Sequence, residues 1–227
     1  MEALPRTSGP EQSRGGHLSP LVRPGATSKE VRYVADVLVT MDEEGHVFQP
    51  GALDVVGGRI TWVGPTEDAP TPASFSERRV GGLVMPGLVN AHAHSPMTLL
   101  RGVGEGLPLE RWLADAIWPR EARLTPEDVW WGMQLGSAEL LRAGVTTTCE
   151  HYVHPRAVAD AALAAGIRCV VAPGIMALPG AGPGATWERL LEDAGQVHGE
   201  LEGCEGRLRV GLGPHSAYAL PAEGLAA

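Results

Sequence analysis

Residues 83–94 read LVMPGLVNAHAH, an apolar stretch that ends in two histidines one residue apart. The apolar residues predict a strand that leads into a loop. Side chains two residues apart in a strand lie on one face, so His92 and His94 can both reach one metal ion. A His-x-His pair also occurs often without a metal, and the pair alone leaves both interpretations open. Gly87 and Pro96 flank the pair and place it where the strand gives way to a loop.

After residue 83 the chain alternates between short apolar segments and longer amphipathic ones. The apolar segments predict strands at residues 145–149, 167–174 and 207–213. The amphipathic segments predict helices at residues 108–118, 125–144, 156–166 and 186–203. Thr125 is suited to cap the second of these helices, and Gly144 is suited to end it. This alternation is typical of parallel strands joined by crossover helices.

Consecutive strand–helix units most often build a closed (β/α)8 barrel or an open doubly wound sheet, so the fold class is α/β. In a barrel, the active site lies at the carboxyl ends of the strands, where His92 and His94 fall. Residues 83–227 are too few for a complete barrel, which takes about 250 residues. We therefore expect about the first four strand–helix units, and a chain that is a fragment or a truncated product.

The residues before this region divide into two parts. Residues 1–28 carry many glycines, prolines and scattered charges without a hydrophobic period, which predicts a disordered extension. Residues 29–82 carry short apolar runs separated by turn signals such as the Val-Gly-Gly at 56–58, which predict a small β unit. The expected organisation is thus an extension, a β unit at 29–82 and a barrel part at 83–227.

Composition and charge narrow the classes of partner. The 227 residues are 44% hydrophobic and 20% charged, which is a globular composition. The 18 basic residues include only one lysine, Lys29, and are outnumbered by 27 acidic residues, which gives a net charge of −9. This balance argues against nucleic acid as a partner and suits small neutral or cationic ligands.

Membrane and disulfide signals are also absent from the sequence. No apolar run reaches the roughly 18 residues that a membrane-spanning helix needs. The first thirty residues also lack the apolar core of a signal peptide. We therefore expect a cytoplasmic protein without a membrane partner. Cys149, Cys169 and Cys204 have unrelated spacings, which favours neither a disulfide framework nor a zinc knuckle.

Residues 85–132, which begin with MPGLVNAHAHSP, resemble the amidohydrolase superfamily. The resemblance is to the branch of S-adenosylhomocysteine/methylthioadenosine deaminases and triazine-type chlorohydrolases. It continues through LLRAGVTTTCEHY at 140–152 and GLGPHSAYAL at 211–220, and it extends from about residue 33 to the end. A small β unit with a Gly-Gly-Arg-Ile hairpin before the Pro-Gly-Leu-Val-Asn-Ala-His-Ala-His run makes the pattern specific.

The resemblance implies a (β/α)8 barrel, preceded by a small β-sandwich part at 29–82, and one divalent metal ion, zinc or iron, with zinc preferred. His92 and His94 match the metal ligands of the family's first barrel strand. Glu121 matches the acid that grips the ribose hydroxyls of an adenosine-type substrate. His215 matches a histidine that contacts the substrate and does not bind the metal.

The chain also departs from the family pattern at several positions. The family's remaining metal ligands and its catalytic glutamate would lie beyond residue 227, so the resemblance implies a chain without catalytic residues that is inactive alone. Met176 stands near the point where some members place a substrate-binding arginine. Glu150 and Tyr152 follow the second strand. In one interpretation they orient the metal ligands or line the pocket. In the other they form a polar pair at the strand end that has no catalytic role.

The expected function is hydrolytic deamination of an aminated heterocycle, with an adenosine-type small-molecule substrate. A triazine-type chlorohydrolase or a guanine- or cytosine-type deaminase is the alternative within the superfamily. An alternative from another class is a non-catalytic half-barrel that associates with a partner, because an incomplete barrel leaves sheet edges and apolar surface uncovered. We expect a homo-oligomer in the first case.

Overall fold

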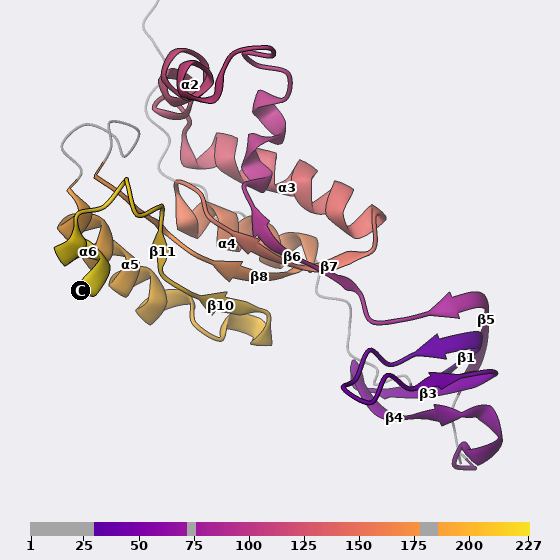
Figure 1. The fold of residues 1–227 in the computed structure, drawn as a ribbon. Coiled ribbons are helices and arrows are strands. Elements are labelled where there is room, and N and C mark those ends of the chain that lie inside the picture. Colours follow the sequence, from indigo (N-terminus) through magenta and orange to yellow (C-terminus); the bar gives the residue numbers. More distant parts are fainter. Residues whose placement is uncertain (1–29, 72–75, 178–185) are drawn as a thin grey trace, which may run out of the picture. The chain divides into compact units, whose positions relative to one another are not determined.

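The computed structural model describes residues 30–71, 76–177 and 186–227, and these form two compact units (Figure 1). The first unit takes the described residues up to Leu38 and from Val47 to Leu83. The second takes Val39–His46 and Val84–Ala227. The extension expected at residues 1–28 lies outside the described residues.

The first unit is built on a five-stranded sheet in which β2, β1, β3 and β4 are neighbours in that order and β5 pairs with β1. Its elements are β1 (Val31–Val39), β2 (Val47–Phe48), β3 (Gly51–Val56), β4 (Arg59–Pro65), the short 3-10 helix η1 (Thr66–Asp68) and β5 (Ser76–Val84). Gly57 and Gly58 both have positive φ, at 58° and 78°, and form the two-residue turn between β3 and β4. The Val-Gly-Gly turn signal is therefore confirmed.

A buried ion pair lies within this sheet. The guanidinium of Arg32 donates to both carboxylate oxygens of Asp54, each at 2.7 Å, and Arg32 also lies 5.8 Å from the ring centroid of Trp62. Asp54 is opposite Arg32 in the antiparallel register of β1 and β3, which explains why both charges can be buried.

The second unit contains a four-stranded parallel sheet with the strand order β10-β8-β7-β6. Its strands are β6 (Leu88–Ala93), β7 (Val145–Glu150), β8 (Arg168–Val171) and β10 (Leu208–Val210), and β9 (Gly174–Ile175) pairs with β11 (Gly213–Pro214). Its helical elements are η2 (Ser95–Leu100), α1 (Leu109–Arg111), η3 (Trp112–Ile117), α2 (Trp118–Glu121), α3 (Pro126–Arg142), α4 (Pro155–Ala165), α5 (Trp187–Leu201), η5 (Cys204–Gly206) and α6 (Ala222–Ala226). Spatial neighbours in the sheet follow each other along the chain, as expected for strand–helix units.

Three of the predicted strands are interrupted. The segment at 167–174 forms β8 and then β9, the segment at 207–213 forms β10 and then β11, and residues 83–94 hold the end of β5 and then β6. Pro173 lies in the first interruption and has no N–H to continue the hydrogen bonding of the sheet. The prediction of one continuous strand in each segment was therefore wrong.

Helix α3 begins and ends where the sequence predicts. Thr125 accepts a hydrogen bond from the N–H of Asp128, and the Asp128 carboxylate accepts one from the N–H of Thr125, so the helix has a capping box. Gly144 follows the helix with φ of 82°, which favours glycine. The core beneath α3 and α4 is made of apolar residues from both helices and the sheet, including Met133, Val158, Ile167, Val171 and Leu208.

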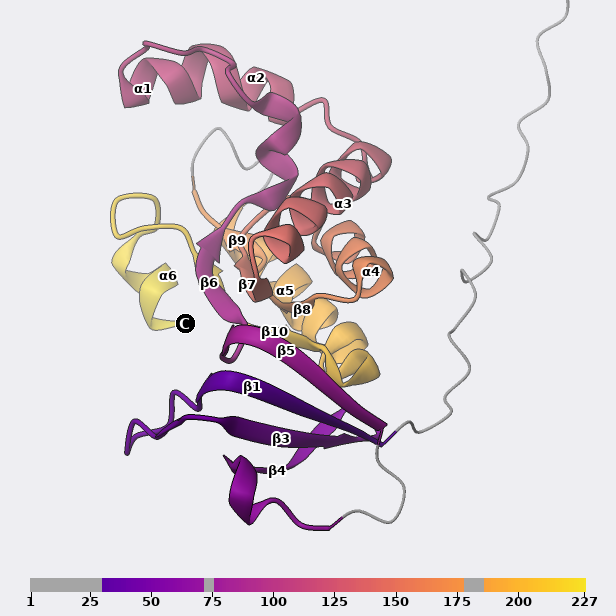
Figure 2. The same cartoon turned by 90° about the vertical axis from the view of Figure 1, so that its right-hand side faces the viewer.

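Helix α3 also approaches the segment that follows the two histidines. A Cβ atom at Gly132 would lie 2.5 Å from the carbonyl oxygen of Pro96, and one at Gly136 would lie 2.8 Å from the Cβ of Ser95. Only glycine therefore allows η2 to pack directly on α3. Figure 2 shows this helix, with α4, on one side of the parallel strands.

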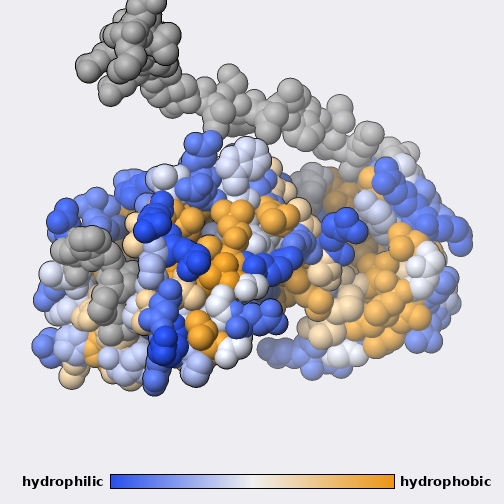
Figure 3. All heavy atoms as spheres, turned by 90° about the horizontal axis from the view of Figure 1, so that it is seen from above, coloured by the Kyte–Doolittle hydropathy of each residue, from blue (hydrophilic) through white to orange (hydrophobic). Residues whose placement is uncertain are grey.

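Apolar side chains reach the surface in several places (Figure 3). On the second unit the exposed ones include Leu88 and Val89 of β6 and Trp131 of α3, with 51%, 65% and 58% of their surface exposed. Among the helices of the described residues, none combines the length and the apolar character needed to cross a membrane.

Candidate metal and substrate site

His92 and His94 lie together where β6 ends. Their Nε2 atoms are 3.1 Å apart, and their rings meet edge to face with centroids 4.9 Å apart. Two nitrogens that each bind a zinc ion at about 2.0–2.1 Å are about 3.3 Å apart in tetrahedral geometry. The two Nε2 atoms therefore converge at a separation that one metal ion can bridge, and the residues present fit a shared divalent ion.

The orientation of His94 is fixed by the next strand. Its Nδ1 lies 2.6 Å from the backbone carbonyl oxygen of His151, directly after β7. A carbonyl only accepts, so Nδ1 carries the proton and Nε2 keeps its lone pair toward His92. A second hydrogen bond of this kind is typical of histidines that bind metals.

Glu150 holds the residue after His94. It is 1% exposed, and its carboxylate accepts hydrogen bonds from the N–H of Ser95 at 2.7 Å, the hydroxyl of Ser95 at 2.6 Å and the hydroxyl of Thr148 at 2.6 Å. Consecutive residues of one segment, Glu150 and His151, thus hold the consecutive residues Ser95 and His94. Glu150 contacts neither imidazole in these hydrogen bonds, so any effect on the histidines passes through Ser95.

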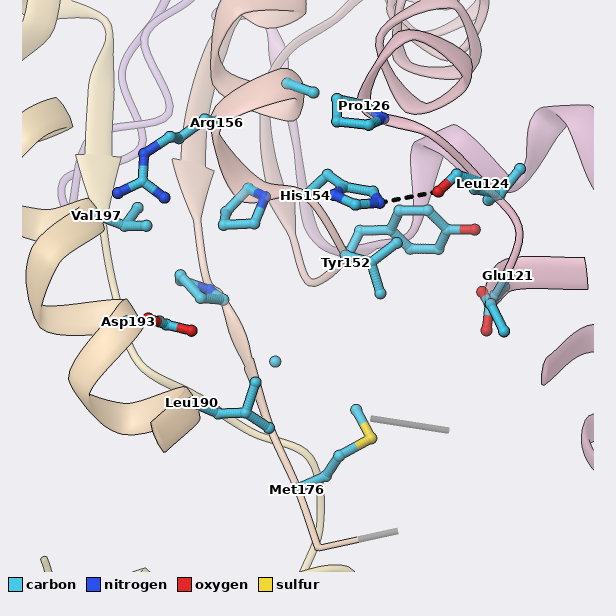
Figure 4. Close-up of a pocket in the computed structure, with 16 residues that line it drawn as sticks. Glu121, Leu124, Pro126, Tyr152, His154, Arg156, Met176, Leu190, Asp193 and Val197 are labelled. Atoms are coloured by element: carbon cyan, nitrogen blue, oxygen red, sulfur yellow. Dashed lines mark hydrogen bonds between the residues drawn. The ribbon is translucent and has the colours of Figure 1, made fainter. Parts of the chain in front are cut away.

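Glu121 and Tyr152 line one side of a pocket, where the Tyr152 hydroxyl points toward Glu121 (Figure 4). Burial raises the pKa of the Glu121 carboxyl, and the nearby Tyr152 and His94 oppose that rise. Burial also raises the pKa of Tyr152, and the Glu121 charge adds to the effect. The buried Tyr152 hydroxyl has no partner of normal hydrogen-bond geometry within the described residues. The hydroxyl is buried and interacts with the Glu121 carboxylate, which it faces.

His215 follows β11 at the same edge of the sheet. Its ring centroid is 5.7 Å from that of His151, which in turn is 5.7 Å from that of His94. The Nε2–H of His151 donates to the carbonyl of Gly213 at 3.0 Å. Burial is the main cause that lowers the pKa of both His151 and His215. Histidines from three strand ends thus form a row.

His151 is the residue whose part in this row the sequence reasoning missed. Its contribution to His94 comes from a backbone carbonyl, which any residue could supply. The available signal was its position: it directly follows a predicted strand, at the edge where parallel strands end.

The pocket has a volume of about 570 Å³ and lies within the second unit. Its walls come from the segment between α2 and α3, the residues after β7, the start of α4, the segment at β9, and α5. The Nε2–H of His154 donates to the carbonyl of Leu124 at 3.0 Å and joins two of these walls (Figure 4). The volume is in the range of small-molecule sites.

A second group of potential ligand atoms lies in the turn before β2. One atom from each of Asp42, Glu44 and His46 lies within 4.8 Å of the other two. The Asp42 carboxylate accepts a hydrogen bond from the N–H of His46 at 2.9 Å and pairs with its Nδ1 at 2.7 Å, which holds the pKa of Asp42 at about 2. These bonds close the turn, and all three side chains are exposed. The group is explained without a metal ion.

Comparison with known proteins gives a consistent result. Residues 83–227 match the amidohydrolase family. The chain is 40% identical over 193 residues to the 5-methylthioadenosine/S-adenosylhomocysteine deaminase of Symbiobacterium thermophilum, a match over 84% of this chain and 43% of that protein. The crystal structure of an adenosine deaminase from Xanthomonas campestris with bound zinc matches with a TM-score of 0.74 and 33% identity, over 86% of this chain and 45% of that one.

A more distant structure shares the fold. The atrazine chlorohydrolase of Arthrobacter aurescens TC1, complexed with zinc, matches with a TM-score of 0.72 and 20% identity, over 85% of this chain and 48% of that one. The chain thus spans less than half the length of these proteins, and it corresponds to their N-terminal part. The family match starts at residue 83, where the sequence also predicts the parallel strands to begin. The chain belongs to the amidohydrolase family.

Proposed function

We propose that this chain supplies part of the active site of a metal-dependent hydrolase that deaminates an adenosine-type nucleoside. The observation that carries the proposal is the 3.1 Å approach of the His92 and His94 Nε2 atoms, with His94 oriented by the His151 carbonyl. Zinc is the expected ion, with iron as the alternative, because imidazole nitrogen is a preferred zinc ligand. A divalent metal held there supplies Lewis acidity for hydrolysis.

The other residues bind and orient the substrate. Glu121, half-buried at the pocket wall, accepts hydrogen bonds from the sugar hydroxyls, and Tyr152 beside it orients the Glu121 carboxylate. His215, in line with His151 and His94, contacts the substrate from the end of β11. Glu150 is a positioning residue that fixes Ser95 and, through it, the place of His94.

Two histidines are fewer ligands than hydrolytic zinc normally has, which is three protein ligands and a water. We propose that residues outside this sequence supply the remaining ligands and the catalytic glutamate. The four parallel strands then form the first half of a (β/α)8 barrel, and the first unit forms part of a β-sandwich. The 227-residue chain alone is expected to be inactive.

The pocket favours a nucleoside over the alternative heterocycles. The Glu121 carboxylate at the pocket wall offers two acceptor oxygens, which suit the paired hydroxyls of a ribose. A triazine or a free guanine base has no such hydroxyls. The deaminase name of the Symbiobacterium relative supports the same choice.

A non-catalytic role in association is the second candidate. Leu88 and Val89 of β6, an end strand in the order of its sheet, are 51% and 65% exposed. Apolar residues on an end strand are a surface for another chain. Analytical ultracentrifugation tests association through β6: a concentration-dependent dimer that Val89→Lys abolishes supports it, and a monomer at all concentrations contradicts it.

Elemental analysis of the purified protein tests the main proposal. We expect bound zinc or iron, and its loss in the His92→Ala/His94→Ala double variant. His198→Ala, which removes an exposed histidine from α5, is the matched control and should retain the metal. Metal content that is unchanged in the double variant would contradict the proposal. Equal deaminase activity of a longer gene product with and without both substitutions would also contradict it.

A further inference from the structure

The imidazole of His151 lies against the short strand pair formed by β9 and β11. Its Nε2–H donates to the carbonyl of Gly213 at 3.0 Å, and Gly213 is opposite Gly174 in the parallel register of the pair. A Cβ atom at Gly213 would lie 2.5 Å from the Cδ2 of the ring, and one at Gly174 would lie 3.2 Å from its Nε2. The ring thus occupies space that two paired glycines leave open.

This contact lies two residues before His215. Strands β9 and β11 are each two residues long, and Pro214 has no N–H to donate, so the pair has few hydrogen bonds of its own. After β11, the N–H of His215 donates to the carbonyl of Ile175 at 3.0 Å. The place of His215 therefore depends on a short strand pair to which the His151 ring adds a hydrogen bond from the side.

The ring of His151 does not join His92 and His94 as a third ligand. No group of three converging ligand atoms in the described part of the chain includes His151. Burial lowers the pKa of His151, so the ring is neutral near pH 7, and its one proton is at Nε2, where the carbonyl of Gly213 accepts it. The contact of His151 with His94 uses the main-chain carbonyl instead. The side chain therefore has a separate structural partner, β11.

We propose that the His151 side chain is a positioning residue for substrate binding, which holds β11 against β9 and thereby fixes the place of His215. The proposal rests on the proposed function, in which His215 contacts the substrate. One residue then supports two parts of the site: its carbonyl orients His94, and its ring places His215. Because the two contacts use different atoms, substitution of the side chain removes the second and leaves the first.

Three variants of the full chain test this hydrogen bond. His151→Leu removes the donor and keeps a side chain of similar bulk. His151→Gln restores a donor, because the amide nitrogen of glutamine can take the place of the imidazole Nε2. Gln134→Leu is the matched control. The Gln134 amide donates to the carbonyl of Ala161 at 2.7 Å, between α3 and α4, so this variant loses the same kind of bond in the helix layer.

Amide hydrogen exchange measured by NMR reports whether β11 stays in place. The N–H of His215 donates to Ile175 after the strand pair, whereas the N–H of Cys169 donates to Arg207 at 3.1 Å at the start of β8. In His151→Leu, the His215 amide should exchange about tenfold faster, while the Cys169 amide keeps its rate. In His151→Gln, the His215 rate should return to within about twofold of that of the unsubstituted chain.

Binding of adenosine, followed by NMR titration, connects β11 with the substrate. The dissociation constant should be about five- to tenfold higher for His151→Leu, and it should change less than about twofold for His151→Gln and Gln134→Leu. In a chain that already carries His215→Ala, the His151→Leu substitution should have no further effect on binding, because it acts through His215.

The outcomes separate this inference from the proposed function. An unchanged His215 exchange rate in His151→Leu overturns the positioning role, as does an equal loss of adenosine binding with and without His215→Ala, and the proposed function stands in both cases. If no form of the chain binds adenosine, the proposed substrate contact of His215 fails. The exchange rates then decide on their own whether the His151 ring holds β11.

Discussion

The Nδ1 atom of His94 lies 2.6 Å from the backbone carbonyl oxygen of His151, across the paired strands β6 and β7. This contact orients an imidazole through the main chain, so substitution of the His151 side chain leaves the accepting atom in place. Immediately beside it, Glu150 accepts three hydrogen bonds, two of them from Ser95. The position of the candidate metal site thus depends on the hydrogen bonds between the end of β7 and the segment after β6.

Glu150→Gln should weaken the hydrogen bonds that hold Ser95 against the end of β7. The amide of glutamine accepts with one atom instead of two, so a Ser95 or Thr148 donor loses its partner in a buried place. We expect a loss of about 1–3 kcal/mol in the free energy of unfolding, measured with urea. Metal affinity should fall by about 10–100-fold in competition with a chelator.

Glu139→Gln is the control for that variant. Glu139 pairs with Arg101 on the exposed surface, and such pairs contribute about 0–1 kcal/mol. Its metal affinity should equal that of the unsubstituted chain. Equal metal affinity in the Glu150 variant would show that Glu150 acts on stability alone.

Gly132→Ala should destabilise the second unit, although alanine is the better helix former. The added methyl group would lie 2.5 Å from the backbone oxygen of Pro96, so α3 and η2 must separate. We expect a loss of about 1–3 kcal/mol in thermal or urea unfolding. Gly195→Ala on α5 meets no atom within 4 Å and should instead stabilise the chain by about 0.5–1 kcal/mol. Effects of the same sign in both variants would contradict the close packing of η2 on α3.

Thr125→Ala should remove the capping box of α3 and reduce stability by about 1 kcal/mol. Thr186 caps α5 with a longer bond, 3.4 Å from its hydroxyl to the N–H of Arg189, compared with 3.2 Å between Thr125 and Asp128. Thr186→Ala should therefore have the smaller effect on the urea midpoint. An equal or larger effect at Thr186 would mean that the shorter hydroxyl bond of Thr125 stabilises its helix no more than the longer one of Thr186 does.

Glu121→Gln should change how stability depends on pH. The pKa of Glu121 is raised above its ordinary 4.5 in the folded chain because the side chain is half-buried, so ionisation disfavours the fold. Protonated Glu121 contributes to the free energy of unfolding, and this contribution is fully present below pH 4.5. It is lost as the pH rises through the pKa of the folded chain. The variant should therefore melt at a higher temperature than the unsubstituted chain at about pH 8, and at a similar one at about pH 4.

The exposed Glu105 provides the control for this pH dependence. Glu105→Gln should shift the melting temperature little at either pH. If Glu121→Gln and Glu105→Gln give the same difference between the two pH values, the effect comes from net charge and not from burial of Glu121.

The sequence predicted the features that depend on near neighbours in the chain. The spacing of His92 and His94 predicted that both side chains lie on one face, and their Nε2 atoms do meet. The capping residue Thr125 and the paired glycines at 57 and 58 predicted a helix start and a turn. Each of these features depends on a few consecutive residues, so the local sequence is enough to predict it.

Contacts between distant segments could not be predicted in the same way. Glu150 bonds to Ser95 across 55 residues, and this depends on the register of β6 against β7, which hydrophobicity does not specify. The carbonyl of His151 is a main-chain group that every residue carries, so only its position after a predicted strand pointed to it. Likewise, Asp193 and Met176 belong to one pocket only because α5 packs near the end of β9. The alternation of strands and helices in the sequence does not determine that packing.

The strand order β6, β7, β8, β10 in the parallel sheet is also the order in which these strands are synthesised. Each strand that leaves the ribosome therefore finds its neighbour already made. Strand β8 follows β7 after one helix, α4, whereas β7 follows β6 only after η2, α1, η3, α2 and α3. The sheet can therefore assemble strand by strand from the N-terminal side during translation. The site histidines on β6 are then available early, and the pairing of β7 completes their support.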